Sequence, residues 1–112
     1  MTAAAYNLTI DQGSDFSLDL VVKEGGAVKS LTGYSARAQM RATKGASTVA
    51  ATFSCSIVDA SAGSLKMELS NSASSAISAG KYYYDLEIYT NSNLIVQRLM
   101  EGTVILTPEV TR

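Results

Sequence analysis

The chain has 112 residues, a net charge of −1, 46% hydrophobic residues and 17% charged residues, which is the balance of one ordinary globular domain. It has no run of like charges, so it lacks the electrostatic footprint of a nucleic-acid binder. One cysteine and no histidine exclude an internal disulfide and a structural zinc site. We therefore expect a single domain over residues 1–112 that has no cofactor and does not bind nucleic acid.

The start of the chain and its apolar runs predict where the protein is made. The N-terminal MTAAAYNLTID has neither the basic start nor the apolar core of a signal peptide. No apolar run in the sequence approaches the length of a membrane span. We expect synthesis in a cytoplasm and no membrane partner.

Apolar and polar residues alternate with a period of two over most of the chain, which predicts strands with one buried face. The face expected to be buried in the first strand carries Tyr6, Leu8 and Ile10. The paired glycines Gly25 and Gly26 predict a turn, because glycine adopts positive φ at little steric cost. In chain order, the first four predicted strands are Ala5–Ile10, Asp15–Lys23, Tyr34–Arg41 and Val49–Asp59.

The second half of the chain continues this pattern with one interruption. The remaining predicted strands are Ser64–Ser70, Lys81–Thr90 and Leu94–Thr107. The small polar stretch Asn71–Ala79 predicts a loop with one helical turn, and Asn91-Ser92-Asn93 has the residues of a hairpin turn. Gly102 inside the last strand predicts a bulge or bend. Seven short strands with turn signals at regular intervals predict an all-β sandwich.

The residues of common catalytic and metal sites are missing or scattered. Without histidine there is no hydrolase triad and no base to activate a serine. Asp85 and Glu87 share one strand face, but polar-outward alternation alone accounts for them. The segment Asp11-x-Gly13-x-Asp15 resembles the start of a calcium loop and lacks its closing glutamate. We expect a protein that is not an enzyme and has no metal site. An enzyme built on scattered carboxylates is the remaining alternative.

Two outward-facing tyrosines form the first candidate contact surface. Alternation places Tyr83 and Tyr89 on the outer face of the predicted strand Lys81–Thr90. Such rings can anchor a protein interface or stack on a sugar. The alternative is that they pack between strands on a solvent-facing surface and bind nothing.

The last predicted strand forms the second candidate surface, because it is apolar on both faces. A strand of this kind is buried on both sides. Either another subunit covers its second apolar face, or a bulge near Gly102 changes which face its residues point to, so that all of its apolar side chains enter one core. Over both surfaces, the candidate protein-contact residues are Tyr83, Tyr89, Leu94, Ile95, Val96, Leu99 and Ile105.

A set of motifs occurs in a fixed order along nearly the whole chain. They are Tyr6-x-Leu8-Thr9-Ile10-x-Gln12-Gly13-x-Asp15-Phe16, Leu31-Thr32-Gly33-Tyr34-x-Ala36-Arg37-Ala38-Gln39-Met40-Arg41, Gly80-x-Tyr82-x-Tyr84-Asp85-Leu86 and Glu101-Gly102-Thr103-Val104, followed by Pro108-Glu109-Val110-Thr111-Arg112. Together they resemble small virion structural proteins of tailed phages and the N-terminal domain of phage baseplate upper proteins, the adaptors that connect receptor-binding proteins to the baseplate.

This resemblance implies an immunoglobulin-like antiparallel β-sandwich of about seven strands with no catalytic motif. It implies other virion proteins as partners, and we expect multiple copies or a symmetric homo-oligomer within the particle. Baseplate adaptors usually continue into a coiled coil or receptor-binding module, whereas this sequence ends at Arg112, so we expect a freestanding module.

The expected function is therefore that of a non-enzymatic tail or baseplate module that binds proteins. Its expected location is the virion, after assembly in the host cytoplasm. One alternative is a capsid decoration protein that uses the same surfaces. Another is a carbohydrate-binding module that uses Tyr83 and Tyr89.

Overall fold

The computed structural model describes residues 4–90 and 94–110, and it is mostly β-structure. Its elements are β1 (Ala4–Ala5), β2 (Leu8–Asp11), β3 (Phe16–Val21), β4 (Lys23–Glu24), β5 (Ala27–Val28), β6 (Tyr34–Arg41), β7 (Ala51–Asp59), β8 (Ser64–Leu69), α1 (Asn71–Ser75), β9 (Gly80–Thr90) and β10 (Val96–Thr107). The larger sheet has the order β1-β10-β9-β6-β7-β8-β3, with β2 also paired to β10, and β4 and β5 form a small second sheet. The prediction of an all-β protein is confirmed.

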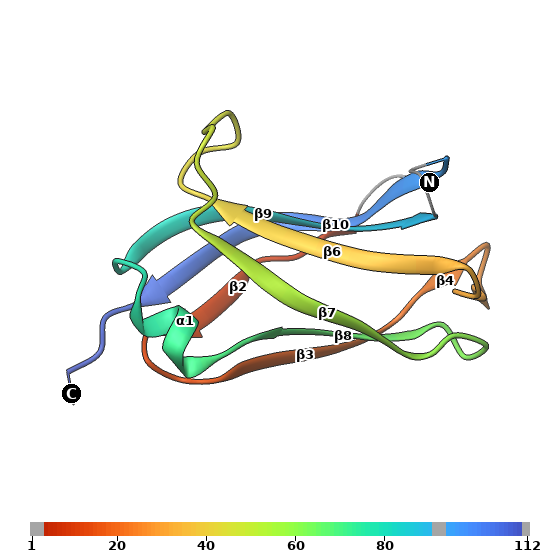
Figure 1. Ribbon diagram of the computed structural model, residues 1–112, viewed down its shortest axis with the longest axis horizontal. Helices are drawn as coiled ribbons and strands as arrows, with labels where there is room; N and C mark the ends of the chain where they lie inside the picture. The colour runs from red at the N-terminus through yellow and green to blue at the C-terminus, as the bar shows by residue number, and fades with distance from the viewer. Residues whose placement is uncertain (1–3, 91–93, 111–112) are drawn as a thin grey trace.

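The larger sheet curls over on itself, and β7 makes the bend (Figure 1). The first residues of β7 pair with β6, at Ala51 to Phe53, and its later residues, from Ser54 onward, pair with β8. One strand therefore belongs to both halves of the sheet. This arrangement brings β8 and β3 to one side of the core and β6, β9 and β10 to the other.

The predicted strand over Tyr34–Arg41 is confirmed as β6, whereas the predicted second strand is divided. The chain leaves β3 at Val21 and then forms the β4–β5 hairpin around Gly25 and Gly26, which have φ of 62° and 84°. The glycine turn was therefore predicted correctly, but β5 was not predicted. The predicted hairpin turn Asn91-Ser92-Asn93 lies outside the described residues.

The predicted first strand is also divided, and the prediction that Tyr6 shares the buried face of Leu8 and Ile10 is wrong. Tyr6 lies between β1 and β2 and its side chain is exposed. The Tyr6 carbonyl lies over Gly102 and accepts a hydrogen bond from the buried Tyr84 hydroxyl. Between β1 and β2 the chain therefore directs a carbonyl, and not a side chain, toward Tyr84, and the ring of Tyr6 remains exposed.

The predicted bulge near Gly102 lies elsewhere. The pairing of β10 with β9 shifts between Arg98 and Met100, so Leu99 is the extra residue. Gly102 itself pairs regularly with Tyr84. A glycine is needed there because an added Cβ would lie 2.3 Å from the Tyr6 carbonyl oxygen. The glycine therefore marks a close approach of two strands, which is the other common reason for glycine in a strand.

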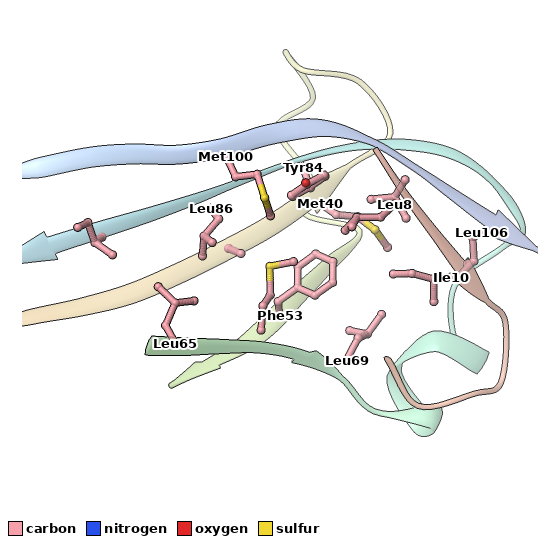
Figure 2. Packing of buried hydrophobic residues seen from close by; sticks show 14 of the residues in the cluster. Leu8, Ile10, Met40, Phe53, Leu65, Leu69, Tyr84, Leu86, Met100 and Leu106 are labelled. Carbon is pink, nitrogen blue, oxygen red and sulfur yellow. The ribbon is translucent and has the colours of Figure 1, made fainter. Parts of the chain in front are cut away.

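Phe53 on β7 connects the two sides of the core. Its ring makes edge-on contacts with Phe16 of β3, at 6.1 Å between centroids, and with Tyr84 of β9, at 6.3 Å. Figure 2 shows it among buried side chains from both halves of the sheet. The largest fully buried hydrophobic side chains are Ile10, Leu31, Met40, Leu65, Met67, Leu86, Ile88, Val104 and Leu106.

The helix α1 closes one end of the core. Its N-cap is Ser70, whose side chain accepts a hydrogen bond from the Ala73 amide. Ser74 is fully buried, and its hydroxyl accepts from the Gly13 amide at 3.0 Å and donates to the Ser14 carbonyl at 2.9 Å. This hydroxyl ties the helix to the turn between β2 and β3.

Two weakly acidic side chains, the half-buried Cys55 thiol and the buried Tyr84 hydroxyl, predict that the protein loses stability in alkaline solution. Burial raises the pKa of the Cys55 thiol from 9.0 to about 11, and burial together with the Tyr6 charge raises that of Tyr84 from 10.0 to about 12. Above pH 9 the unfolded chain ionises at these groups while the folded chain keeps their protons, so the free energy of unfolding falls as pH rises. Urea denaturation between pH 7 and pH 10.5 measures this fall. Cys55→Ala is expected to reduce its slope above pH 9, and an unchanged slope would show that this thiol has no part in it.

Candidate protein-contact surface

The outer face of β6, β9 and β10 carries the two candidate tyrosines. Tyr83 lies opposite Arg41 on β6, and Tyr89 lies opposite Val96 on β10. Both rings are half-buried. They are six positions apart on β9, which is about 20 Å along a strand. The outward orientation predicted for them is confirmed, but they do not form one paired site.

Cations surround Tyr83 at one end of this face. The Lys44 ammonium lies 5.9 Å from the ring centroid, and the Lys81 ammonium lies 5.4 Å from it. The guanidinium of Arg41 donates to the Ala46 carbonyl at 2.9 Å and to the Gln39 side-chain oxygen at 3.2 Å. We call Arg41, Lys44, Lys81 and Tyr83 the basic corner.

Ion pairs occupy the middle of the same face. Arg98 bridges Asp85, at 3.4 Å, and Glu101, at 3.0 Å. Arg37 pairs with Glu87, and its guanidinium lies 4.3 Å above the centroid of the Tyr89 ring. Pairs this exposed contribute little to stability, so their main effect is to neutralise the carboxylates and order the side chains.

A shallow hollow of about 350 Å³ lies over this part of the sheet. It extends from Arg41 and Lys44, at the basic corner, to Glu87 and Arg98, in the ion-paired middle. Asp85 also lines it, and burial raises the pKa of this carboxyl, although the neighbouring Arg98 acts in the opposite direction. The hollow is therefore positive at one end, and at the other end ion pairs neutralise part of the negative charge of its carboxylates.

The start of β10 and the residues before it present apolar side chains to solvent. Leu94, Ile95 and Val96 are 85%, 52% and 46% exposed, and we call these residues the apolar tip. Their position is fixed by the backbone, because the Thr90 amide donates to the Ile95 carbonyl at 3.0 Å and the Ile95 amide donates to the Thr90 hydroxyl at 2.9 Å.

The remaining two candidate residues have different surroundings. Leu99 is half-buried at the bulge and packs against the core, whereas Ile105 is exposed on the outer face opposite Lys81. The bulge therefore does not turn every apolar residue of β10 into one core. The structure brings Leu94, Ile95 and Val96 together and leaves Ile105 further along the strand.

A second hollow was not predicted from the sequence. It has a volume of about 360 Å³, and apolar side chains of β3, β9 and β10 line it, including Leu20, Leu86 and Met100. It lies between β1 and β3, which end the larger sheet on its two sides among the described residues. No local sequence signal indicates it, because it depends on how the curled sheet brings these two strands together.

The three cations of the basic corner were not predicted from the sequence. Lys81 is two residues before Tyr83, so strand alternation was enough to place it on the same face. Arg41 comes from β6 and Lys44 from the loop that follows it, and neither position follows from the residues around Tyr83. The missing information was the pairing of β6 with β9.

In the segment that resembles the start of a calcium loop, the carboxylates of Asp11 and Asp15 accept hydrogen bonds from other residues of the protein. The Asp11 carboxylate accepts a hydrogen bond from the Thr107 hydroxyl at 2.8 Å. The Asp15 carboxylate accepts one from the Asn71 amide at 2.8 Å. These carboxylates hold turns in place, and among residues 4–90 and 94–110 no three metal-binding side chains gather into a site.

Comparison with known proteins leaves the family open. No family model matches the chain, and no curated protein matches it. One solved structure that matches was reported in a study of glycolipid glycan hydrolysis by a family 123 glycoside hydrolase from Clostridium perfringens. The match covers all of this chain and 24% of the hydrolase chain, with 11% sequence identity and a TM-score of 0.47. A likeness this weak carries no argument about fold or activity. Within the described part of the chain, no helix is long and apolar enough to cross a membrane.

Proposed function

We propose that the chain is a non-enzymatic structural module of a phage tail or baseplate, which binds other virion proteins. The observation that carries protein binding is the apolar tip, Leu94, Ile95 and Val96. Contiguous exposed apolar residues are typical of protein contacts. Covering one such side chain fully contributes about 1.5–3 kcal/mol before the costs of association.

We also propose that the curled sheet is an immunoglobulin-like sandwich. Its support is the parallel pairing of β2 with β10, beside the antiparallel pairing of β10 with β9. A further support is the hydrogen bond from the Tyr82 hydroxyl to the Ser78 carbonyl, at the start of β9. A tyrosine at this corner, bonded to the backbone a few residues upstream, recurs in immunoglobulin-like domains.

The ordered sequence motifs support the phage setting, and several of their residues stabilise the fold. Gly13 has a φ of 84° in the turn after β2 and Gly102 lies under the Tyr6 carbonyl. Asp15 and Tyr82 make hydrogen bonds that join adjoining segments. These roles suit a family whose shared residues maintain a scaffold and leave function to the surface.

The two alternative functions have different support. A capsid decoration protein would use the same apolar tip, and release of the domain from isolated heads rather than tails would identify it. A carbohydrate-binding module is less well supported, because Arg37 already lies over Tyr89 and about 20 Å of strand separates the two rings.

Introducing a charge into the apolar tip tests the proposal. Ile95→Lys is expected to reduce incorporation into particles at least about tenfold, because a lysine cannot be covered by an apolar contact without a large desolvation cost. The free energy of unfolding should change by less than about 0.5 kcal/mol, since Ile95 is exposed. Incorporation is measured by quantifying the domain in purified particles.

Val58→Lys is the matched control, because Val58 is an exposed valine, at 60%, on β7. It should be incorporated as efficiently as the wild type. Equal incorporation of both variants would show that the apolar tip is not the contact.

A further inference from the structure

The basic corner has positive charge that no ion pair among the described residues takes up. None of the ion pairs among the described residues includes Arg41, Lys44 or Lys81. Arg41 donates hydrogen bonds to two neutral acceptors, the Ala46 carbonyl and the Gln39 amide oxygen. Burial raises the pKa of the nearby Asp85 carboxyl, and the charge of Arg41 acts on this carboxyl in the opposite direction and lowers its pKa. The three cations are therefore available to an anion from outside.

The aromatic ring at the centre of the basic corner adds a surface for packing. Two lysines lie near the half-buried ring of Tyr83, and its hydroxyl has no hydrogen-bond partner among the described residues. Ile105 is exposed beside Lys81 on the neighbouring strand. The site thus offers an ammonium or guanidinium donor within reach of an aromatic and an aliphatic contact.

The ion-paired middle of the face limits the length of the anion. Asp85, Glu87 and Glu101 lie along the outer face of β9 and β10 beyond the basic corner. Arg37 and Arg98 neutralise them only in part, since three carboxylates face two guanidiniums. A long polyanion that continued in this direction would meet carboxylates, and the net charge of −1 gives it no general attraction to the domain.

We infer that the basic corner binds a short acidic segment of a partner protein, whose carboxylates contact Arg41, Lys44 and Lys81 and whose adjoining side chain packs on Tyr83. Charge complementarity supports this occupant. The three cations repel basic segments, and they attract and orient an acidic one. Arg41, Lys44 and Tyr83 line one end of the hollow, where the acidic segment would lie, and Asp85, Glu87 and Glu101 line the rest of it. This contact is separate from the apolar tip and has different chemistry.

Peptide binding to the isolated domain tests this inference. The probes are fluorescein-labelled hexaglutamate and hexaglutamine peptides, measured by anisotropy at low salt. Hexaglutamate is expected to bind, with an affinity that falls as salt rises, and hexaglutamine is not. The double variant Lys44→Gln with Lys81→Gln is expected to weaken hexaglutamate binding about fivefold. Tyr83→Leu is expected to leave hexaglutamate binding unchanged and to weaken the binding of a hexaglutamate peptide that carries an added aromatic residue.

The matched control is Lys23→Gln with Lys66→Gln, on β4 and β8, which removes the same net charge elsewhere. It should bind hexaglutamate as the wild type does, and circular dichroism should show that all variants are folded. Equal weakening by both double variants, or equal binding of both peptides, would overturn the inference. If an oligothymidylate of ten nucleotides or a heparin hexasaccharide binds more tightly than hexaglutamate, the inference that the ligand is a protein segment would be wrong.

Discussion

Replacing Phe53 by alanine is expected to lower the free energy of unfolding by about 3–5 kcal/mol. Phe53 is only 3% exposed and touches Phe16 and Tyr84 from opposite halves of the curled sheet. The truncation leaves a cavity where these halves meet. A domain of this size has a total stability of about 5–15 kcal/mol, so the variant is expected to be close to unfolding. Urea denaturation followed by circular dichroism measures the change.

Another position on the same strand provides the control. Val58→Ala removes an apolar side chain that is 60% exposed, so it should change the free energy of unfolding by less than about 0.5 kcal/mol. A loss of less than about 1 kcal/mol in Phe53→Ala would contradict the packing of Phe53 between the two halves.

Gly102→Ala is expected to lower the free energy of unfolding by about 1–3 kcal/mol through overpacking. The added Cβ would lie 2.3 Å from the Tyr6 carbonyl oxygen and 2.8 Å from its carbon. These are backbone atoms, so the segment between β1 and β2 must move away from β10. The same movement should stretch the hydrogen bond from the Thr103 amide to the Asn7 side chain, and amide exchange at Thr103 should become faster.

Gly45→Ala is the control for this substitution. An added Cβ at Gly45 meets no atom within 4 Å, and its φ lies outside the left-handed region. Its effect on stability should be close to zero or slightly favourable, because alanine restricts the unfolded chain. If both alanine variants have the same stability, the close approach of Tyr6 to Gly102 is not a constraint on the fold.

Strand positions were predictable where the pattern is local. The alternation of residues over Tyr34–Arg41 contains its own periodicity, and β6 has those bounds. The division of the first strand at Tyr6 was not predictable, because it depends on Gly102 and Tyr84 at the far end of the chain. The bulge was placed at the only glycine in the strand, whereas the pairing with β9 places it at Leu99.

The candidate surface shows the same division between local and long-range information. Alternation alone placed Tyr83 and Tyr89 on the outer face, where the structure has them. Exposure of Leu94 to Val96 was expected only as one of two alternatives, since a two-sided apolar strand does not say what covers it. The basic corner needed the pairing of Arg41 with Tyr83, which joins residues more than forty positions apart in the sequence.

Localisation on the particle tests the proposed function most directly. The proposed function requires that a phage encodes this chain, so virions purified from that phage would be labelled with an antibody to the domain and imaged by electron microscopy. Particles assembled with the Ile95→Lys variant in place of the wild-type domain serve as the comparison. Their label should be weaker, because the variant is expected to be incorporated less. Label at the tail end of wild-type virions is the predicted result, and virions without label on any part of the particle would contradict a structural role in it.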